Sequence, residues 1–133
     1  MVAMRSAESE KITINLGYVD LGRVDLLVAE GFYGNRTDLI RTAIRNLLDR
    51  HAEAVRGSVA RKGLDLGLRR YGRKELEAAR DAGLPLAIRV LGFASIASDV
   101  TPDLARAAIA SVEVLGTLQA SPAVRAALAD RIR

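Results

Sequence analysis

From residue 11 to residue 16 apolar and polar side chains alternate strictly, and this short run constrains the fold of the chain more than any other feature. The apolar positions are Ile12, Ile14 and Leu16, and the polar positions are Lys11, Thr13 and Asn15. Because successive side chains of a β-strand point to opposite faces, the alternation predicts a short strand with one buried face and one exposed face.

A first amphipathic helix is predicted to follow this strand. Asp20 is expected to cap its N-terminus, and Gly31, which adopts a left-handed conformation at little cost, is expected to end it. Apolar residues recur between them at three- and four-residue spacing, at Leu21, Val24, Leu27 and Val28.

A second helix is predicted to begin at Asn35. Asn35 and Asp38 have the spacing of a capping pair, with an amide at the N-cap position and a carboxylate three residues later. The wide apolar stripe that follows consists of Leu39, Ile40, Ala43, Ile44, Leu47 and Leu48.

One strand and two helices in about 45 residues cannot hide this much aliphatic surface, because domains of that size bury too little of it. We therefore expect a second copy of the chain to supply the missing core. If the strand pairs with its symmetry mate, the apolar side packs on the helices and the polar side of both chains points outward. Such a two-stranded ribbon fits the major groove of B-DNA, which is about 12 Å wide.

Three features of this region match a known family: the alternating strand KITINL, a glycine turn between the helices, and an Asn-Arg-Thr-Asp opening to the second helix. With them, residues 11–51, and only these, resemble the ribbon-helix-helix repressors of the CopG, Arc and MetJ type. The resemblance implies a dimer that binds double-stranded DNA and regulates transcription.

The resemblance also implies that Lys11, Thr13 and Asn15 read DNA bases. Lysine and asparagine are chemically suited to guanine and adenine edges, respectively. The alternative interpretation is that these three side chains face only water.

A phosphate contact is implied at the start of the second helix, at Asn35, Arg36 and Thr37. Free N–H groups and the positive end of the helix dipole favour an anion there. The alternative is an ordinary helix cap, and the two roles are compatible because different N–H groups can serve each.

The charge distribution gives the DNA-binding interpretation only partial support. Residues 1–54 carry seven Lys and Arg and eight Asp and Glu, although the whole chain has a formal net charge of +4. The positive excess lies between Arg56 and Lys74, where Asp65 is the single acidic residue. This stretch either supports phosphate contacts beside the ribbon or forms a solvated surface.

In the C-terminal half, Gly67, Gly92 and Gly116 each close a short aliphatic run, LDLG, RVLG and EVLG, at separations of 25 and 24 residues. A helical segment is predicted after each, over residues 73–82, 102–110 and 122–132, the last two capped by Thr101 and Ser121 before a proline. A period in the twenties predicts a solenoid of three strand-turn-helix units with parallel strands, of leucine-rich type. The alternative is an α/β or helical unit in which the glycine spacing is accidental.

The sequence thus predicts an α+β fold with two domains. Residues 8–54 form the ribbon-helix-helix dimerisation and DNA-binding domain, and residues 58–133 form a repeat-like domain for oligomerisation or partner binding. The segment from Val55 to Gly63 is interpreted as the end of the second helix or a short hinge, since it contains glycine and serine.

Several functional classes find no support in the sequence. It contains no Cys and one His, His51, which is interpreted as a polar group at a helix C-terminus, so we expect no metal site and no cofactor. No nucleophile or phosphate-loop motif occurs, and we expect no enzyme. No apolar run approaches the ~20 residues that cross a bilayer, and the N-terminus lacks a signal-peptide pattern, so we expect a cytoplasmic, nucleoid-associated protein without a membrane partner.

Two functions remain. The first is a sequence-specific repressor that acts as a homodimer or higher homo-oligomer. The second is an antitoxin-like or scaffolding protein whose C-terminal half binds a protein partner. Related antitoxins usually continue into a disordered tail, so the aliphatic C-terminal half favours the repressor.

Overall fold

A computed structural model describes residues 9–133 of the chain. Within this range it contains six helices and one three-stranded parallel sheet, which makes an α+β fold. The chain divides into two compact units, one that ends at Ser58 and one formed by Val59–Arg133. Each unit is described by itself.

Two helices dominate the N-terminal unit, α2 (Tyr18–Ala29) and α3 (Arg36–Arg50). The predicted cap of the first helix was wrong: Gly17 occupies the N-cap position, and Asp20 lies in the first turn. A carboxylate in the first turn still favours the helix, because it faces the positive end of the helix dipole. The end of α2 is as predicted, with Gly31 at a φ of +86° directly after the C-cap residue.

The predicted break between residues 55 and 63 was also wrong in position. The helical path is interrupted earlier, at His51, which is the C-cap of α3, and a further helix, α4 (Ala52–Lys62), follows at once. Gly57 and Ser58 lie inside α4 and do not break it. Each lowers the stability of a helix only modestly, so the surrounding residues can keep the helix formed. The segment ends at Gly63, whose φ of +63° suits glycine.

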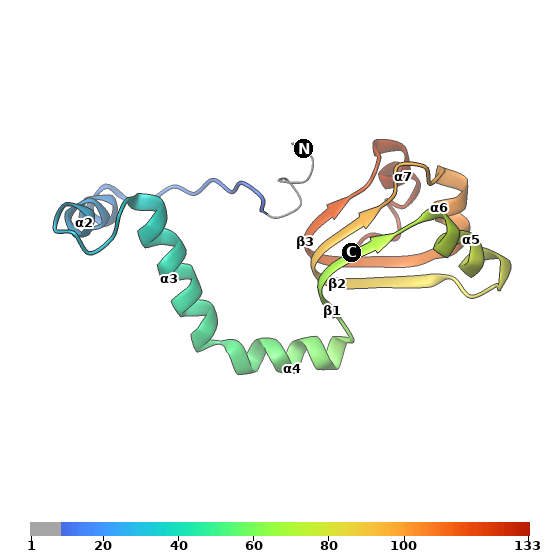
Figure 1. Cartoon of the computed structure of the whole chain (residues 1–133), viewed down its shortest axis with the longest axis horizontal. Helices are drawn as coiled ribbons and strands as arrows, with labels where there is room; N and C mark the ends of the chain where they lie inside the picture. The colour runs from blue at the N-terminus through green and yellow to red at the C-terminus, as the bar shows by residue number, and fades with distance from the viewer. Residues whose placement is uncertain (1–8) are drawn as a thin grey trace. The chain divides into compact units, whose positions relative to one another are not determined.

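Three strand-helix pairs follow one another in the C-terminal unit (Figure 1). The elements are β1 (Asp65–Tyr71), α5 (Arg73–Asp81), β2 (Leu86–Ile96), α6 (Pro102–Ala108), β3 (Ile109–Gln119) and α7 (Pro122–Ala127). The strands are parallel and lie in chain order, β1-β2-β3, as the repeat predicted. Thr101 and Ser121 cap α6 and α7 by accepting hydrogen bonds of 3.2 Å from the N–H groups of Leu104 and Val124.

The three repeat glycines lie in one row across the sheet, with Gly67 paired to Gly92 and Gly92 paired to Gly116. All three have positive φ angles, of 115°, 137° and 120°. A Cβ atom on Gly92 would overlap the carbonyl oxygen of Gly67, and one on Gly116 would overlap that of Gly92. These glycines were predicted to close the strands, yet each strand continues beyond its glycine, to Tyr71, Ile96 and Gln119.

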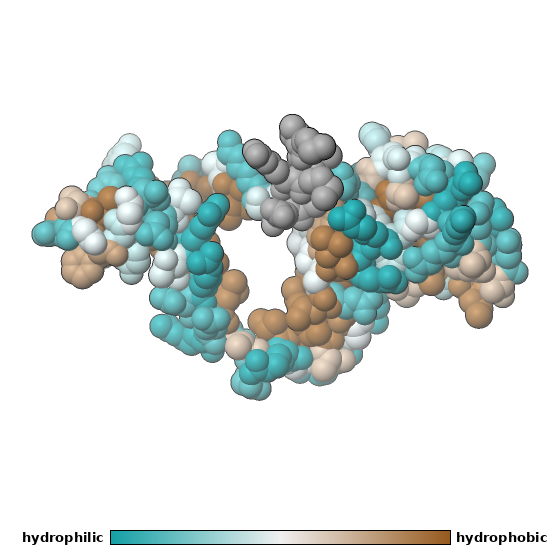
Figure 2. All heavy atoms as spheres, in the orientation of Figure 1, coloured by the Kyte–Doolittle hydropathy of each residue, from teal (hydrophilic) through white to brown (hydrophobic). Residues whose placement is uncertain are grey.

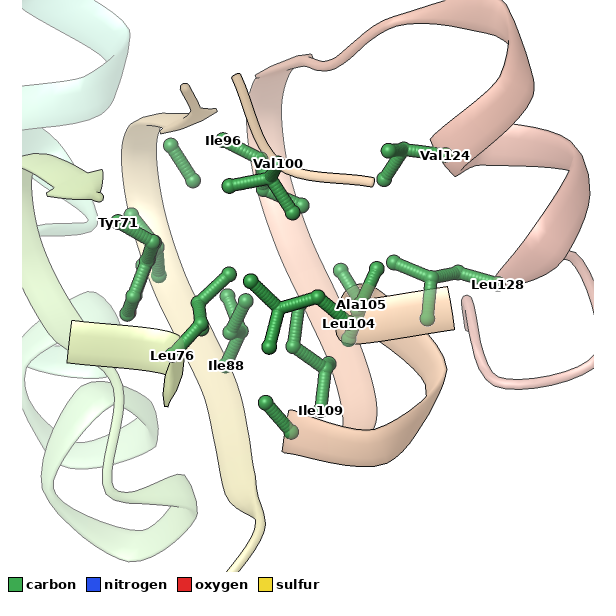
Figure 3. Close-up of a cluster of buried hydrophobic side chains, with 14 residues drawn as sticks. Tyr71, Leu76, Ile88, Ile96, Val100, Leu104, Ala105, Ile109, Val124 and Leu128 are labelled. Carbon is green, nitrogen blue, oxygen red and sulfur yellow. The ribbon is translucent and has the colours of Figure 1, made fainter. Parts of the chain in front are cut away.

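A hydrophobic core fills the space between the inner face of the sheet and the helices that follow its strands (Figure 3). Leu76 from α5, Ile88 from β2 and Leu128 after α7 are fully buried in it. Two of the helices end earlier than predicted. α6 ends at Ala108 because β3 begins at Ile109, and α7 ends at Ala127 because the chain after it turns back to the sheet. There Ile132 pairs with Val112 of β3.

Candidate nucleic-acid interface

The segment that contains Lys11, Thr13 and Asn15 lies before α2 and forms neither helix nor strand (Figure 1). The predicted strand is therefore not formed within one chain, since no other segment of the described chain pairs with residues 11–16. All three polar side chains are exposed to solvent.

The apolar side chains of the same run are exposed as well. Ile12 is 71% exposed, Ile14 55% and Leu16 40%. A single chain thus leaves both sides of the run open to water, and the one-sided burial that the alternation predicts requires a partner. Removing the exposed part of these three side chains from water would stabilise such a complex by roughly 1–2 kcal/mol each, because full burial of an exposed aliphatic side chain contributes about 1.5–3 kcal/mol.

Hydrophobic side chains also lie open on the helices of this unit (Figure 2). None of the residues of α2, α3 or α4 is buried. The large exposed ones include Leu26, Leu27, Ile44, Leu47 and Leu48. The N-terminal unit of one chain therefore has no core of its own, and exposed apolar surface of this extent marks an interface.

The start of α3 is tightly organised. Asn35 is its N-cap, and its side-chain oxygen accepts a hydrogen bond of 2.8 Å from the N–H of Asp38. The Asp38 carboxylate accepts one of 2.9 Å from the N–H of Gly34. The first intrahelical bond runs from Leu39 N to Asn35 O, so the N–H groups of Arg36 and Thr37 precede the hydrogen-bonded helix and point outward from its end.

Arg36 makes a contact that the sequence did not reveal. Its guanidinium donates two hydrogen bonds to the Asp25 carboxylate of α2, Nε to Oδ1 at 2.7 Å and Nη2 to Oδ2 at 2.8 Å. These bonds hold the pKa of Asp25 below its ordinary value, because they stabilise the ionised carboxylate, and they raise the pKa of Arg36. The pair braces α2 against α3 and occupies the side chain that was predicted to reach a phosphate.

A prediction follows from the lowered pKa of Asp25. The brace is complete above the ordinary aspartate pKa of about 4 and is lost as the pH falls below it, because the carboxylate is then protonated. We expect Asp25→Asn to lower the melting temperature slightly at pH 7, and the difference from the parent protein to shrink below pH of about 4. Melting curves by circular dichroism at several pH values measure this. Asp49→Asn, at the other end of α3, is the matched control, and a difference that does not change with pH would rule out the brace.

The basic stretch from Arg56 to Lys74 is largely compensated by acidic partners. Its ion pairs include Lys62 with Glu113 at 3.6 Å, Arg69 with Glu75 at 3.4 Å, and Arg73 with Glu77 at 3.8 Å. Arg56 is also paired, with Glu53. The stretch is therefore better described as a solvated surface than as an unbroken positive patch.

Two other kinds of site find no candidate in the described residues. No cluster of three or more His, Cys, Asp or Glu side chains that could hold a metal ion occurs between residues 9 and 133. In the same range, no helix is both long and apolar enough to cross a membrane.

The model of the ribbon-helix-helix transcriptional regulator family matches residues 7–125. The chain belongs to this family. No curated protein and no solved structure matches the chain. As a ribbon-helix-helix regulator it binds DNA, regulates transcription and is not an enzyme.

The family match covers far more of the chain than the sequence resemblance did. Residues 11–51 carried that resemblance, whereas the match continues through the three strands and into α7. The C-terminal unit of this ribbon-helix-helix regulator is therefore part of what defines the family, and not an unrelated addition.

Proposed function

We propose that the protein is a repressor that binds its operator as a homodimer and inserts a two-stranded ribbon, one strand from each chain, into the major groove. The observation that carries this proposal is the composition of the N-terminal unit's surface, with exposed apolar side chains on residues 12–16 and on the helices, and with no buried residue between residues 9 and 58. A second copy supplies both the missing core and the missing partner strand.

In this dimer Lys11, Thr13 and Asn15 read the bases. They alternate with the apolar side chains that enter the shared core, so pairing of the two segments turns all of them to the side away from it. Lysine donates to the O6 and N7 atoms of guanine, and asparagine pairs in two places with adenine. A few well-placed groups are sufficient, which is consistent with the near-neutral charge of the first 54 residues.

The start of α3 binds a DNA phosphate through the main chain. The N–H groups of Arg36 and Thr37 lie at the positive end of the helix dipole, while the Asn35 side chain holds the cap. The Arg36 guanidinium stays on Asp25 and supports the position of this helix end.

We expect simultaneous replacement of Lys11, Thr13 and Asn15 by Ala to abolish the preference for the operator, because each lost base contact costs ~1–3 kcal/mol. The dimer and the binding to unrelated DNA should persist. The operator is first obtained by selecting bound fragments from genomic DNA, and affinities for operator and unrelated duplexes are then measured by fluorescence anisotropy.

Lys74→Ala is the control for this experiment, since it removes one positive charge outside the ribbon and should leave selectivity unchanged. If the triple variant still prefers the operator, these three residues do not read bases. If it becomes monomeric, their role is in dimerisation.

The folded C-terminal unit supports a repressor over an antitoxin-like protein. Its three parallel strands and the helices that follow them share a continuous core, which includes Leu76, Ile88 and Val112. A segment that folds only on a partner would lack such a core.

A further inference from the structure

The open edge of the C-terminal sheet is the strongest unassigned interaction surface of the described chain. β1 is an edge strand, and most of its residues are exposed, with Leu66 73% and Leu68 52% exposed. On its opposite face the side chains of Asp65 and Arg69 are 62% and 42% exposed. An exposed edge strand of this kind offers unpaired N–H and C=O groups to another strand.

The other edge of the sheet is partly closed. Val112 of β3 donates a hydrogen bond of 2.9 Å to the Arg131 carbonyl and accepts one of 2.8 Å from the Arg133 N–H. The C-terminal residues thereby protect β3 along part of its length, and between residues 9 and 133 no segment pairs with the β1 edge in this way.

Gly67 marks where a further strand can approach. It shares the positive φ of Gly92 and Gly116, whose missing Cβ atoms make room for the carbonyl of the preceding strand. Beside Gly67 no described atom lies within 4 Å of the corresponding position, because β1 is the first strand of the sheet in the described part of the chain. The backbone is therefore already shaped for a close neighbour at this point.

We propose that β1 pairs in antiparallel orientation with β1 of a second copy, around a two-fold axis at Gly67, and joins two three-stranded sheets into one. This inference takes the second copy from the homodimer proposed above. Residues directly opposite in such a pair lie on the same face of the sheet.

This register is complementary on both faces. On the outer face Leu66 lies opposite the partner's Leu68, so that two leucine pairs cover each other. On the inner face Asp65 lies opposite the partner's Arg69, and the two-fold axis repeats this ion pair. Opposite charges and apolar pairs at directly facing positions both stabilise antiparallel strands.

The two-fold arrangement is favoured over parallel addition of β3 from another copy. A two-fold interface closes on itself, whereas head-to-tail addition would continue without limit into filaments. The partial cover that residues 131–133 place on β3 opposes such growth.

Two single variants of the 133-residue chain test the charge pairing. In a homodimer of Asp65→Arg or of Arg69→Asp, like charges face each other, whereas a mixed dimer of the two variants restores both opposite pairs. Each variant loses the internal Asp65–Arg69 contact of 3.7 Å equally, so this contact does not favour the mixture. We expect differently tagged chains, refolded together in equal amounts, to show a ratio of mixed dimers to homodimers of about 3 or more by native mass spectrometry, against a ratio of about 1 for a statistical mixture.

The outcomes separate this inference from the dimer itself. A statistical mixture of dimers would overturn the β1 pairing and leave the N-terminal dimer standing. A parent protein that is monomeric in the same measurement would overturn the dimer proposal. Large, concentration-dependent species of the parent protein would point to head-to-tail addition and also overturn the two-fold pairing.

The register has its own test, because the chain contains no cysteine. A mixture of Leu66→Cys and Leu68→Cys chains should form a disulfide-linked heterodimer under a mild oxidant, since facing residues lie within the distance that a disulfide spans. Either variant alone should stay largely uncrosslinked, because its two cysteines would be offset along the strands. Equal crosslinking of the single variants and the mixture would contradict the register.

Discussion

Replacement of Gly92 or Gly116 by Ala is expected to destabilise the C-terminal unit strongly. A Cβ atom at either position would overlap the carbonyl oxygen of the preceding strand, and both residues have φ angles above +100° that other residues rarely adopt. Backbone atoms of neighbouring strands cannot move apart without breaking the sheet, so we expect a loss of about 3 kcal/mol or more in the free energy of unfolding. The melting temperature should fall by roughly 15 °C or more, as measured by circular dichroism.

Two other glycines calibrate this expectation. Gly72 has nothing near its missing Cβ and a φ of −90°, so Gly72→Ala should change the melting temperature little. At Gly67 the φ of +115° would strain an alanine, but its Cβ would meet no other atom of the described chain. The melting temperature of Gly67→Ala should therefore lie between those of Gly72→Ala and Gly92→Ala. If Gly92→Ala and Gly72→Ala had the same melting temperature, the sheet would not require glycine at the positions of the row.

Ile14→Lys is expected to abolish both dimerisation and DNA binding. Ile14 is 55% exposed in one chain, and in the proposed dimer it enters the core that the two copies share. A two-fold axis would place two ammonium groups in that core, and burial of an unpaired charge costs several kcal/mol. The dimer should therefore weaken by at least about 100-fold, which sedimentation equilibrium measures.

Thr13→Lys is the matched control, because it introduces the same side chain one position earlier, on the outward side of the strand. It should remain dimeric, and its added charge should if anything strengthen binding to unrelated DNA. Should Ile14→Lys and Thr13→Lys remain equally dimeric, the alternation would not define a buried side and an exposed side.

The N-terminal helices were predictable because their signals are local. The asparagine cap at residue 35 and the glycine at residue 31 each depend on a few neighbouring atoms, and both are found where expected. The strand at residues 11–16 could not be confirmed in the same way, since one chain does not form it. In the proposed dimer its hydrogen-bonding partner is the same segment of the second copy.

The repeat shows what a periodic spacing can and cannot predict. The separations of 25 and 24 residues predicted repeated units with parallel strands, which the structure confirms, and the register also places the three glycines in one row. The strands were predicted too short. After Gly67, for example, the two charged residues Arg69 and Arg70 are typical of a polar loop, whereas β1 continues to Tyr71. Arg69 remains in the strand with its guanidinium 4.6 Å from the centre of the Tyr71 ring.

The contact between Arg36 and Asp25 lay beyond sequence reasoning for a physical reason. The two residues are 11 positions apart on different helices, and no periodic pattern links them. Only the angle between α2 and α3 brings the guanidinium to the carboxylate. A residue predicted to act on a ligand can in this way be engaged within the protein instead.

The glycine row also gives the C-terminal unit a natural way to lengthen. Each strand meets the one before it through the same glycine contact, so duplication of a segment of 24 or 25 residues with its glycine would insert a complete layer without disturbing its neighbours. Insertions of other lengths would displace the glycine from its carbonyl. Tolerance to gain or loss of sequence in this region should therefore come in whole layers.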